Sequence, residues 1–170
     1  MSMAGLEMLS VSEKLGGPFV PWRVGTSGEP LATYNLDEAS MAKRFFLSTQ
    51  KNRSAEADAV SVSLMSHGWE RTFAWKGEDG SNTNGHAAIA VAELQGVRDA
   101  DVLVVLLPGG FGTHVEIGAA LALGKPVILH APDHKTLETP YLCVFHYHPA
   151  VKLLISEPLD VGAIMACMEE

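Results

Sequence analysis

The feature that most constrains the fold is an apolar run that leads into a glycine-rich segment. Residues 102–107 are apolar without a break, which is typical of a strand buried on both faces of a parallel sheet. The segment 108–116, PGGFGTHVE, follows this run, and the small and apolar residues of 115–123 predict a helix. A buried strand, a glycine loop and a helix make half of a βαβ unit, so these residues predict an α/β fold.

The glycine segment is also the expected ligand site. Gly109, Gly110 and Gly112 let the backbone turn tightly and approach a ligand where a Cβ would clash. The following helix points free N–H groups and its positive dipole end back at the segment, where phosphate, carboxylate or sugar oxygens can bind. In open α/β sheets, ligands bind at the carboxyl ends of the strands, which is where this segment lies.

Strands and helices are predicted to alternate along the rest of the chain. The predicted strands are 44–48, 69–75, 102–107, 127–130 and 151–155, and the predicted helices are 54–67, 86–95, 115–123 and 161–168. Trp69, Phe73 and Trp75 are expected on one side of the second strand. Residues 76–85 and 131–140 are expected to be loops. This order predicts a three-layer α/β sandwich with a central, mostly parallel, Rossmann-like (flavodoxin-like) sheet.

Residues 1–40 differ from the rest of the chain. Pro18, Pro21 and Pro30 interrupt them, and Met41 begins a basic segment just before the first predicted strand. We expect an N-terminal extension that is either loosely ordered or an arm covering the domain. Residues 41–170 are expected to form the α/β domain.

Composition and charge exclude several classes of protein. The formal net charge is −8 and no run of Lys and Arg exists, which argues against a nucleic-acid partner. No apolar run approaches the roughly 20 residues of a membrane span. The N-terminus lacks the basic-then-apolar order of a signal peptide. We therefore expect a soluble, cytoplasmic protein with no membrane partner.

No metal ion or redox cofactor is expected from the sequence. Cys143 and Cys167 are too few and too far apart to predict a disulfide framework or a zinc site. Four histidines of the second half lie in predicted loops and strands, without a carboxylate at ligand spacing. These ordinary histidines are His130, His134, His146 and His148.

Thr113 and Glu116 stand three residues apart at the start of the predicted helix. One interpretation is a capping box, in which the Thr113 hydroxyl caps the helix and Glu116 reaches back to the Thr113 N–H. The other is a carboxylate held in the ligand crevice, where it can attack an anomeric carbon and form a covalent glycosyl intermediate. The spacing alone does not choose between them.

The segment 108–130, PGGFGTHVEIGAALALGKPVILH, resembles the signature of the nucleoside 2-deoxyribosyltransferase family. That family also includes enzymes that hydrolyse the N-glycosidic bond of nucleoside 5′-monophosphates. Upstream, 45–48 (FFLS) resembles the family's first strand, and 93–97 (ELQGV) resembles the segment before the motif. The likeness spans about 42–170 and is strongest over 93–130.

The resemblance implies that Glu116 is the nucleophile at C1′ of the sugar and that Glu93 occupies an acidic position in the pocket. From its own helical pattern, Glu93 fits a solvated position as well as a buried one. The residues that the resemblance implies for substrate binding are Ser48, Thr49, Asn52, Gly109, Gly110, Gly112, Thr113 and His114. It further implies a small nucleoside or nucleotide substrate, no cofactor, and a homo-oligomer.

One position departs from the family pattern. Well-characterised transferases of the family carry an aspartate six residues before the nucleophile, where this chain has Gly110. Departure of the base requires a proton, so the missing acid leaves hydrolysis and base exchange as alternatives. No basic cluster marks a 5′-phosphate site, although Lys51 and Arg53 could serve.

Two further interpretations are kept. The pattern PGGxGTxxE is also the signature of phosphoribohydrolases that release cytokinin bases, but 86–101 lacks the Arg-Lys pair that those proteins usually carry. The other alternative is a non-catalytic nucleotide-binding module, which needs the glycine loop and the helix dipole but no nucleophile.

Overall fold

A computed structural model describes residues 42–74, 83–138 and 142–169. The expected N-terminal extension, 1–40, lies outside the described residues. Among the helices of the described ranges, none is long and apolar enough to cross a membrane.

The described strands form one five-stranded parallel sheet in the order β2-β1-β3-β4-β5. The strands are β1 (Arg44–Thr49), β2 (Glu70–Arg71), β3 (Val102–Leu106), β4 (Val127–Ala131) and β5 (Val151–Ile155). This is the flavodoxin-like order, in which the chain leaves β1 in one direction for β2 and returns on the other side for β3. The predicted α/β class and parallel sheet are confirmed.

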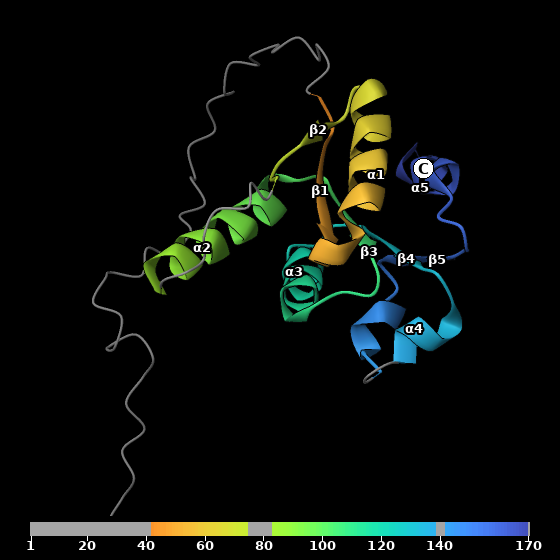
Figure 1. Ribbon diagram of the computed structural model, residues 1–170. Helices are drawn as coiled ribbons and strands as arrows, with labels where there is room; N and C mark the ends of the chain where they lie inside the picture. The colour runs from red at the N-terminus through yellow and green to blue at the C-terminus, as the bar shows by residue number, and fades with distance from the viewer. Residues whose placement is uncertain (1–41, 75–82, 139–141, 170) are drawn as a thin grey trace, which may run out of the picture. The chain divides into compact units, whose positions relative to one another are not determined.

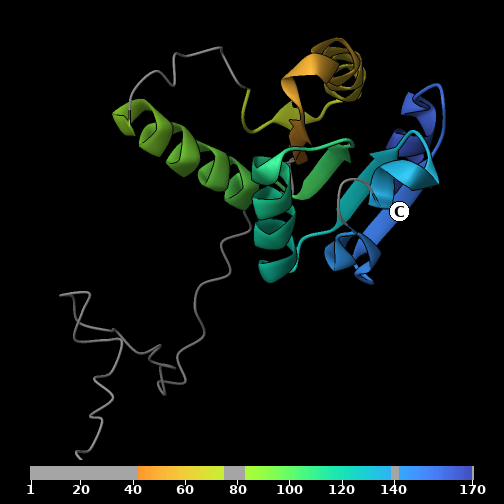
Figure 2. The same ribbon diagram turned by 60° about the horizontal axis from the view of Figure 1, so that its bottom comes forward.

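Helices cover both faces of the sheet (Figures 1 and 2). The helices are α1 (Ser54–Ser66), α2 (Thr83–Asp99), α3 (Phe111–Ala122), α4 (His134–Glu138) and α5 (Val161–Glu169), with short 3₁₀ segments η2 (Lys51–Arg53) and η3 (Val144–Tyr147). α1 and α5 lie on one face, and α3 lies on the other, where the C-terminal end of α2 contacts it while the rest of α2 projects away from the sheet. The expected three-layer sandwich is therefore observed.

Two apolar cores follow from the alternation of side chains along the buried strands. Phe45 of β1 packs with Val104 of β3 and Val60 of α1 on one face. Phe46 packs with Val105 and with Ile117 of α3 on the other face. All of β3 and β4 is buried, which explains the unbroken apolar sequence of β3 and the apolar start of β4, Val127–Leu129.

The second predicted strand, 69–75, is wrong in its length. β2 pairs with β1 only over Glu70–Arg71, after which the chain turns away from the sheet edge. As a result, Trp69 packs against the core beneath α1 and α5, whereas Phe73 packs against the other core and stacks on Phe46 at 5.8 Å. Trp75 lies outside the described residues.

Three boundaries differ from the predicted ones. α2 runs from Thr83 to Asp99 rather than over 86–95, and the predicted loop 131–140 contains α4. α3 begins at Phe111 rather than at Val115. The last difference is the most informative, because Gly110 at the N-cap and Gly112 in the first turn conceal the start of α3 from propensity rules.

Candidate active site

A cavity of about 650 Å³ opens at the carboxyl ends of β1 and β3, where the strand order reverses. This is the place where open α/β sheets bind their ligands. The polar and small residues that line it are Ser48, Thr49, Gln50, Asn52, Ser54, Asp58, Arg71, Glu93, Gly110, Gly112, Thr113 and Glu116. It therefore brings together most of the residues that the sequence suggested, from β1, η2, α2 and the start of α3.

Glu116 is the buried carboxylate of this cavity. It lies on the second turn of α3, and only 7% of its surface is exposed. The Ser48 hydroxyl, at the end of β1 and 3% exposed, donates a hydrogen bond to Glu116 Oε2. One oxygen is thus oriented by the sheet, and the carboxyl group faces the cavity from a fixed position.

The environment of Glu116 favours its protonated form. Burial raises the pKa of Glu116 to about 7, the Ser48 hydroxyl opposes this rise, and the charge of Glu93 adds to it. Burial also raises the pKa of Glu93, which lines the same cavity from α2. Two acidic groups in one crevice with raised pKa values are typical of sites that transfer protons or attack electrophiles.

The capping-box interpretation of Thr113 and Glu116 is wrong. The N-cap of α3 is Gly110 and makes no side-chain cap hydrogen bond, so Thr113 already lies inside the helix. The Glu116 carboxylate accepts from Ser48 and not from the start of its own helix. The buried Thr113 side chain instead packs under Gly109, where an added Cβ would come within 2.5 Å of Thr113 Cγ2.

Side chains after β1 hold the glycine segment in place. Thr49 Oγ1 donates to the Leu106 carbonyl at 3.0 Å, and Gln50 Nε2 donates to the Gly109 carbonyl at 3.0 Å. The Arg53 guanidinium donates to the Leu107 carbonyl and pairs with Glu56. Arg53 thus supports the backbone of the loop and is not among the described residues that line the cavity. The side chain of Lys51 lies outside the described part of the chain.

Two residues of the expected substrate site are not among the described residues that line the cavity: Gly109 and His114. Gly109 lies against Thr113 beneath the loop, and its role is close backbone approach. The His114 ring bonds through Nδ1 to the Gly110 carbonyl at 2.8 Å and stacks on His146, with ring centroids 5.3 Å apart. His114 thus faces η3 and not the cavity.

Sequence reasoning missed Arg71 and Asp58. Arg71 lies at the carboxyl end of β2 and donates through Nη1 to Ser61 at 3.0 Å, while its buried Nε has no partner among the described residues. Burial lowers the pKa of Arg71, and the charge of Asp58 opposes this. The position of Arg71 at the end of a strand could have marked it as a candidate. Its place at the cavity, however, depends on the pairing of β2 with β1, which the sequence does not give.

A family model described as nucleoside 2-deoxyribosyltransferase matches residues 41–165. The chain belongs to the nucleoside 2-deoxyribosyltransferase family. Members of this family act on nucleosides or nucleotides as small-molecule substrates. No curated protein matches the chain.

Three solved structures are similar to this member of the family. A CMP N-glycosidase from Clostridium botulinum is 20% identical, with 75% of this chain and 98% of that chain covered and a TM-score of 0.49. A 2-deoxyribosyltransferase from Bacillus psychrosaccharolyticus is 16% identical (71% and 89% covered, TM-score 0.53). A conserved protein from Enterococcus faecalis V583 is 15% identical (75% and 97% covered, TM-score 0.54). At these identities the last two support the fold alone.

Proposed function

We propose that this chain cleaves or transfers the N-glycosidic bond of a nucleoside or nucleoside 5′-monophosphate, with Glu116 as the nucleophile at C1′. The observation that carries the proposal is the Glu116 carboxyl group, buried at the floor of the cavity and oriented by Ser48. Membership of the family supports the bond that is attacked.

In the first step, a Glu116 oxygen bonds to C1′ as the bond between C1′ and the base nitrogen breaks. The bonding electron pair stays with the base, which takes a proton from the carboxyl group of Glu93. The raised pKa of Glu93 supports this role, because burial lets that carboxyl group keep its proton to higher pH. The reactive form of the pair is the one in which Glu93 holds the proton and Glu116 is ionised. Burial of Glu116 opposes its charge in the empty site, and a developing oxocarbenium ion would favour the ionised form.

In the second step, water or the N–H of another base attacks C1′ and passes a proton to the Glu93 carboxylate. The bond between Glu116 and the sugar breaks, and both carboxyl groups return to their first state. Hydrolysis and transfer differ only in this acceptor. Since Gly110 leaves space where characterised transferases carry an acid, we favour water as the acceptor.

Arg71 supports a substrate that carries a phosphate. Its guanidinium is the cation that faces the cavity among the described lining residues, and its Nε is unpaired among them. Guanidinium groups bind phosphate oxygens through fixed pairs of N–H donors. We therefore favour nucleoside 5′-monophosphates over nucleosides.

The test is chromatography of released bases. The protein is incubated with 2′-deoxynucleosides and nucleoside 5′-monophosphates, with and without a second base. Glu116→Ala is expected to lose on the order of 10³-fold or more in turnover, while the exposed control Glu138→Gln keeps it. Acid-quenched wild-type protein should carry the sugar on the peptide that contains Glu116.

Arg71→Gln separates the two substrate classes. It should raise KM for a 5′-monophosphate about tenfold and leave KM for the nucleoside unchanged, with exposed Arg98→Gln as the control. Base release that survives in Glu116→Ala would refute the nucleophile. Nucleotide binding without turnover in the wild type would favour the binding-module alternative.

We also infer that the chain assembles with copies of itself, as the sequence led us to expect. Phe111 is 96% exposed between two glycines of the cavity wall, and Val115 one turn later is 60% exposed. Apolar surface of this kind is typical of a site that another chain covers. Light scattering of the wild type and of Phe111→Ser tests this, and a monomeric wild type would refute it.

A further inference from the structure

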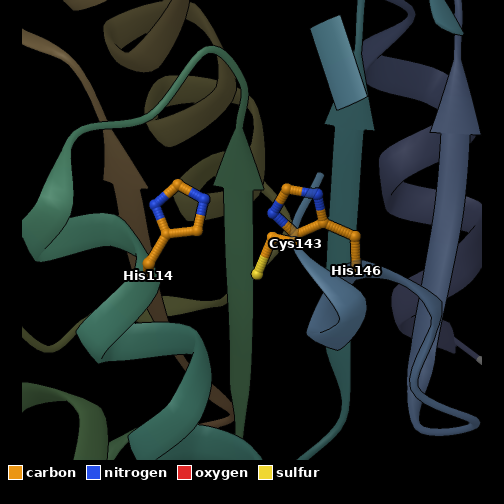
Figure 3. A group of neighbouring side chains, drawn as sticks. All are labelled: His114, Cys143 and His146. Atoms are coloured by element: carbon orange, nitrogen blue, oxygen red, sulfur yellow. The ribbon is translucent and has the colours of Figure 1, made fainter. Parts of the chain in front are cut away.

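Three metal-ligating side chains converge behind the glycine segment. His114 comes from the first turn of α3, Cys143 precedes η3, and His146 lies within η3. One donor atom from each residue lies within 4.8 Å of the other two. Figure 3 shows both rings turned toward each other, with the Cys143 sulfur beside them. Residues from two separate elements thus form one cluster of nitrogen and sulfur donors.

His146 is the anomaly in this cluster. It is 3% exposed, and neither of its ring nitrogens has a hydrogen-bond partner among the described residues. Buried polar atoms are nearly always hydrogen-bonded, and leaving one unpaired costs free energy. A ring that is buried without partners among the described residues, and that faces a thiol and a second imidazole, is suited to a group that accepts an electron pair from all three.

His114 is already oriented as a ligand. Its Nδ1 donates to the Gly110 carbonyl at 2.8 Å, so Nε2 carries the free lone pair, and this nitrogen lies on the His146 side of the ring (Figure 3). Metal-bound histidines usually donate their other ring N–H to a carbonyl or carboxylate in this way, which fixes the tautomer and the ring orientation.

We propose that His114, Cys143 and His146 bind a divalent transition-metal ion of the zinc type. Two imidazoles and one thiolate suit zinc and its softer neighbours and do not suit Mg²⁺ or Ca²⁺, which prefer oxygen. Tetrahedral zinc places such donors about 3.3 to 3.6 Å apart. The present separations of up to 4.8 Å therefore need only about an ångström of closure, by rotation of side chains. Three protein ligands leave the fourth position to water.

The site is separate from the cavity but connected to it. None of the three ligands is among the described residues that line the cavity. Their link to it is Gly110, whose carbonyl holds the His114 ring and which lines the cavity itself. A bound ion would fasten η3 to the first turn of α3, the helix that carries Glu116. Its expected role is to stabilise this turn and not to contact substrate.

Cobalt titration of the full, untagged chain tests the proposal. The protein is stripped with a chelator and titrated with Co²⁺ at neutral pH. We expect one equivalent to bind, with visible bands of tetrahedral cobalt and a near-ultraviolet band from thiolate-to-cobalt charge transfer. One equivalent of Zn²⁺ should abolish both. Zn²⁺ should also raise the thermal midpoint of unfolding.

Matched variants assign the ligands. Cys143→Ser should lose the charge-transfer band, and His114→Gln and His146→Gln should each weaken binding at least tenfold. Cys167→Ser and His134→Gln, which change the other free cysteine and an exposed histidine, should bind as the wild type does. Circular dichroism of each metal-free variant checks its fold.

Two results would overturn the proposal. One is a wild-type protein that binds no stoichiometric Co²⁺ or Zn²⁺. The other is an unchanged charge-transfer band and affinity in Cys143→Ser, which would place the metal elsewhere. If His146→Gln does not fold, Cys143→Ser and His114→Gln still decide the matter, because both residues are only half-buried.

Discussion

The first two turns of α3 carry a buried polar site on each side. Glu116 faces the cavity, and its carboxylate finds a partner within the chain, the Ser48 hydroxyl. His114 faces η3, where the buried nitrogens of His146 find none among the described residues. Residues two positions apart on a helix point in nearly opposite directions. One helix therefore supports a site whose carboxylate has a partner among the described residues and a site for which we propose a metal ion.

The first test of this difference replaces the carboxyl group of Glu116, on the cavity side, by an amide that cannot ionise. Burial raises the pKa of Glu116 from 4.5 to about 7. Between these values the folded chain holds a proton that the unfolded chain has released, so the free energy of unfolding falls as the pH rises. The shift corresponds to a loss of about 3 kcal/mol in the free energy of unfolding. This loss is absent below pH 4.5 and complete above pH 7. Glu116→Gln should remove this loss and keep the hydrogen bond from Ser48.

Denaturant unfolding at pH 5 and pH 8 measures the effect. The stability of the wild type relative to Glu116→Gln should fall between the two pH values, and the exposed control Glu138→Gln should follow the wild type. Parallel curves for all three proteins would mean that Glu116 is ionised in the folded chain at both pH values. The inference that burial raises its pKa would then be wrong.

The second test strains the loop on the cavity side. An added Cβ at Gly109 would meet Thr113 Cγ2 at 2.5 Å, and Thr113 is a buried, β-branched residue that cannot rotate away cheaply. Gly109→Ala should lower the free energy of unfolding by about 1 to 3 kcal/mol. Gly110→Ala is the control, because its Cβ would meet nothing within 4 Å and its φ of −89° suits any residue. Equal stability of both variants would show that Thr113 does not fix the loop.

The cavity side was accessible to sequence reasoning because its signals are local. The unbroken apolar run of β3 follows from burial on both faces. The glycines and Glu116 stand next to each other in one motif. What failed there was the start of α3, because Gly110 caps the helix without a side-chain hydrogen bond and leaves no capping signal.

The other side was not accessible, because its residues meet only through the fold. Cys143 and His146 reach His114 only after β4 and α4 have intervened. For the same reason Arg71 was missed, since only the pairing of β2 with β1 brings it to the cavity. Counting histidines and cysteines along the chain predicted no metal site, and the spatial cluster now argues for one.

The third test removes the hydrogen-bond donor to Glu116, the Ser48 hydroxyl. The Ser48 hydroxyl lowers the pKa of Glu116, so Ser48→Ala should raise that pKa and move the rise of kcat/KM with pH to higher values. At pH 7, kcat/KM should fall about tenfold, and the two proteins should converge in alkaline solution. Ser66→Ala, on the exposed end of α1, is the control. A uniform loss at every pH would mean that Ser48 does more than tune the carboxylate.

The fourth test replaces the buried imidazole on the other side of α3, and here we expect a gain in the stability of the metal-free protein. In the metal-free structure, the buried nitrogens of His146 have no partners among the described residues. Its replacement by an apolar side chain of similar volume removes that cost, so His146→Leu should stabilise the metal-free protein by about 1 kcal/mol. With saturating Zn²⁺ the order should reverse, because only the wild type gains from binding. Denaturant unfolding with chelator and with Zn²⁺ measures both. If His146→Leu is strongly destabilised in chelator, the imidazole is satisfied by the chain itself, and the two sides of α3 do not differ in the way described.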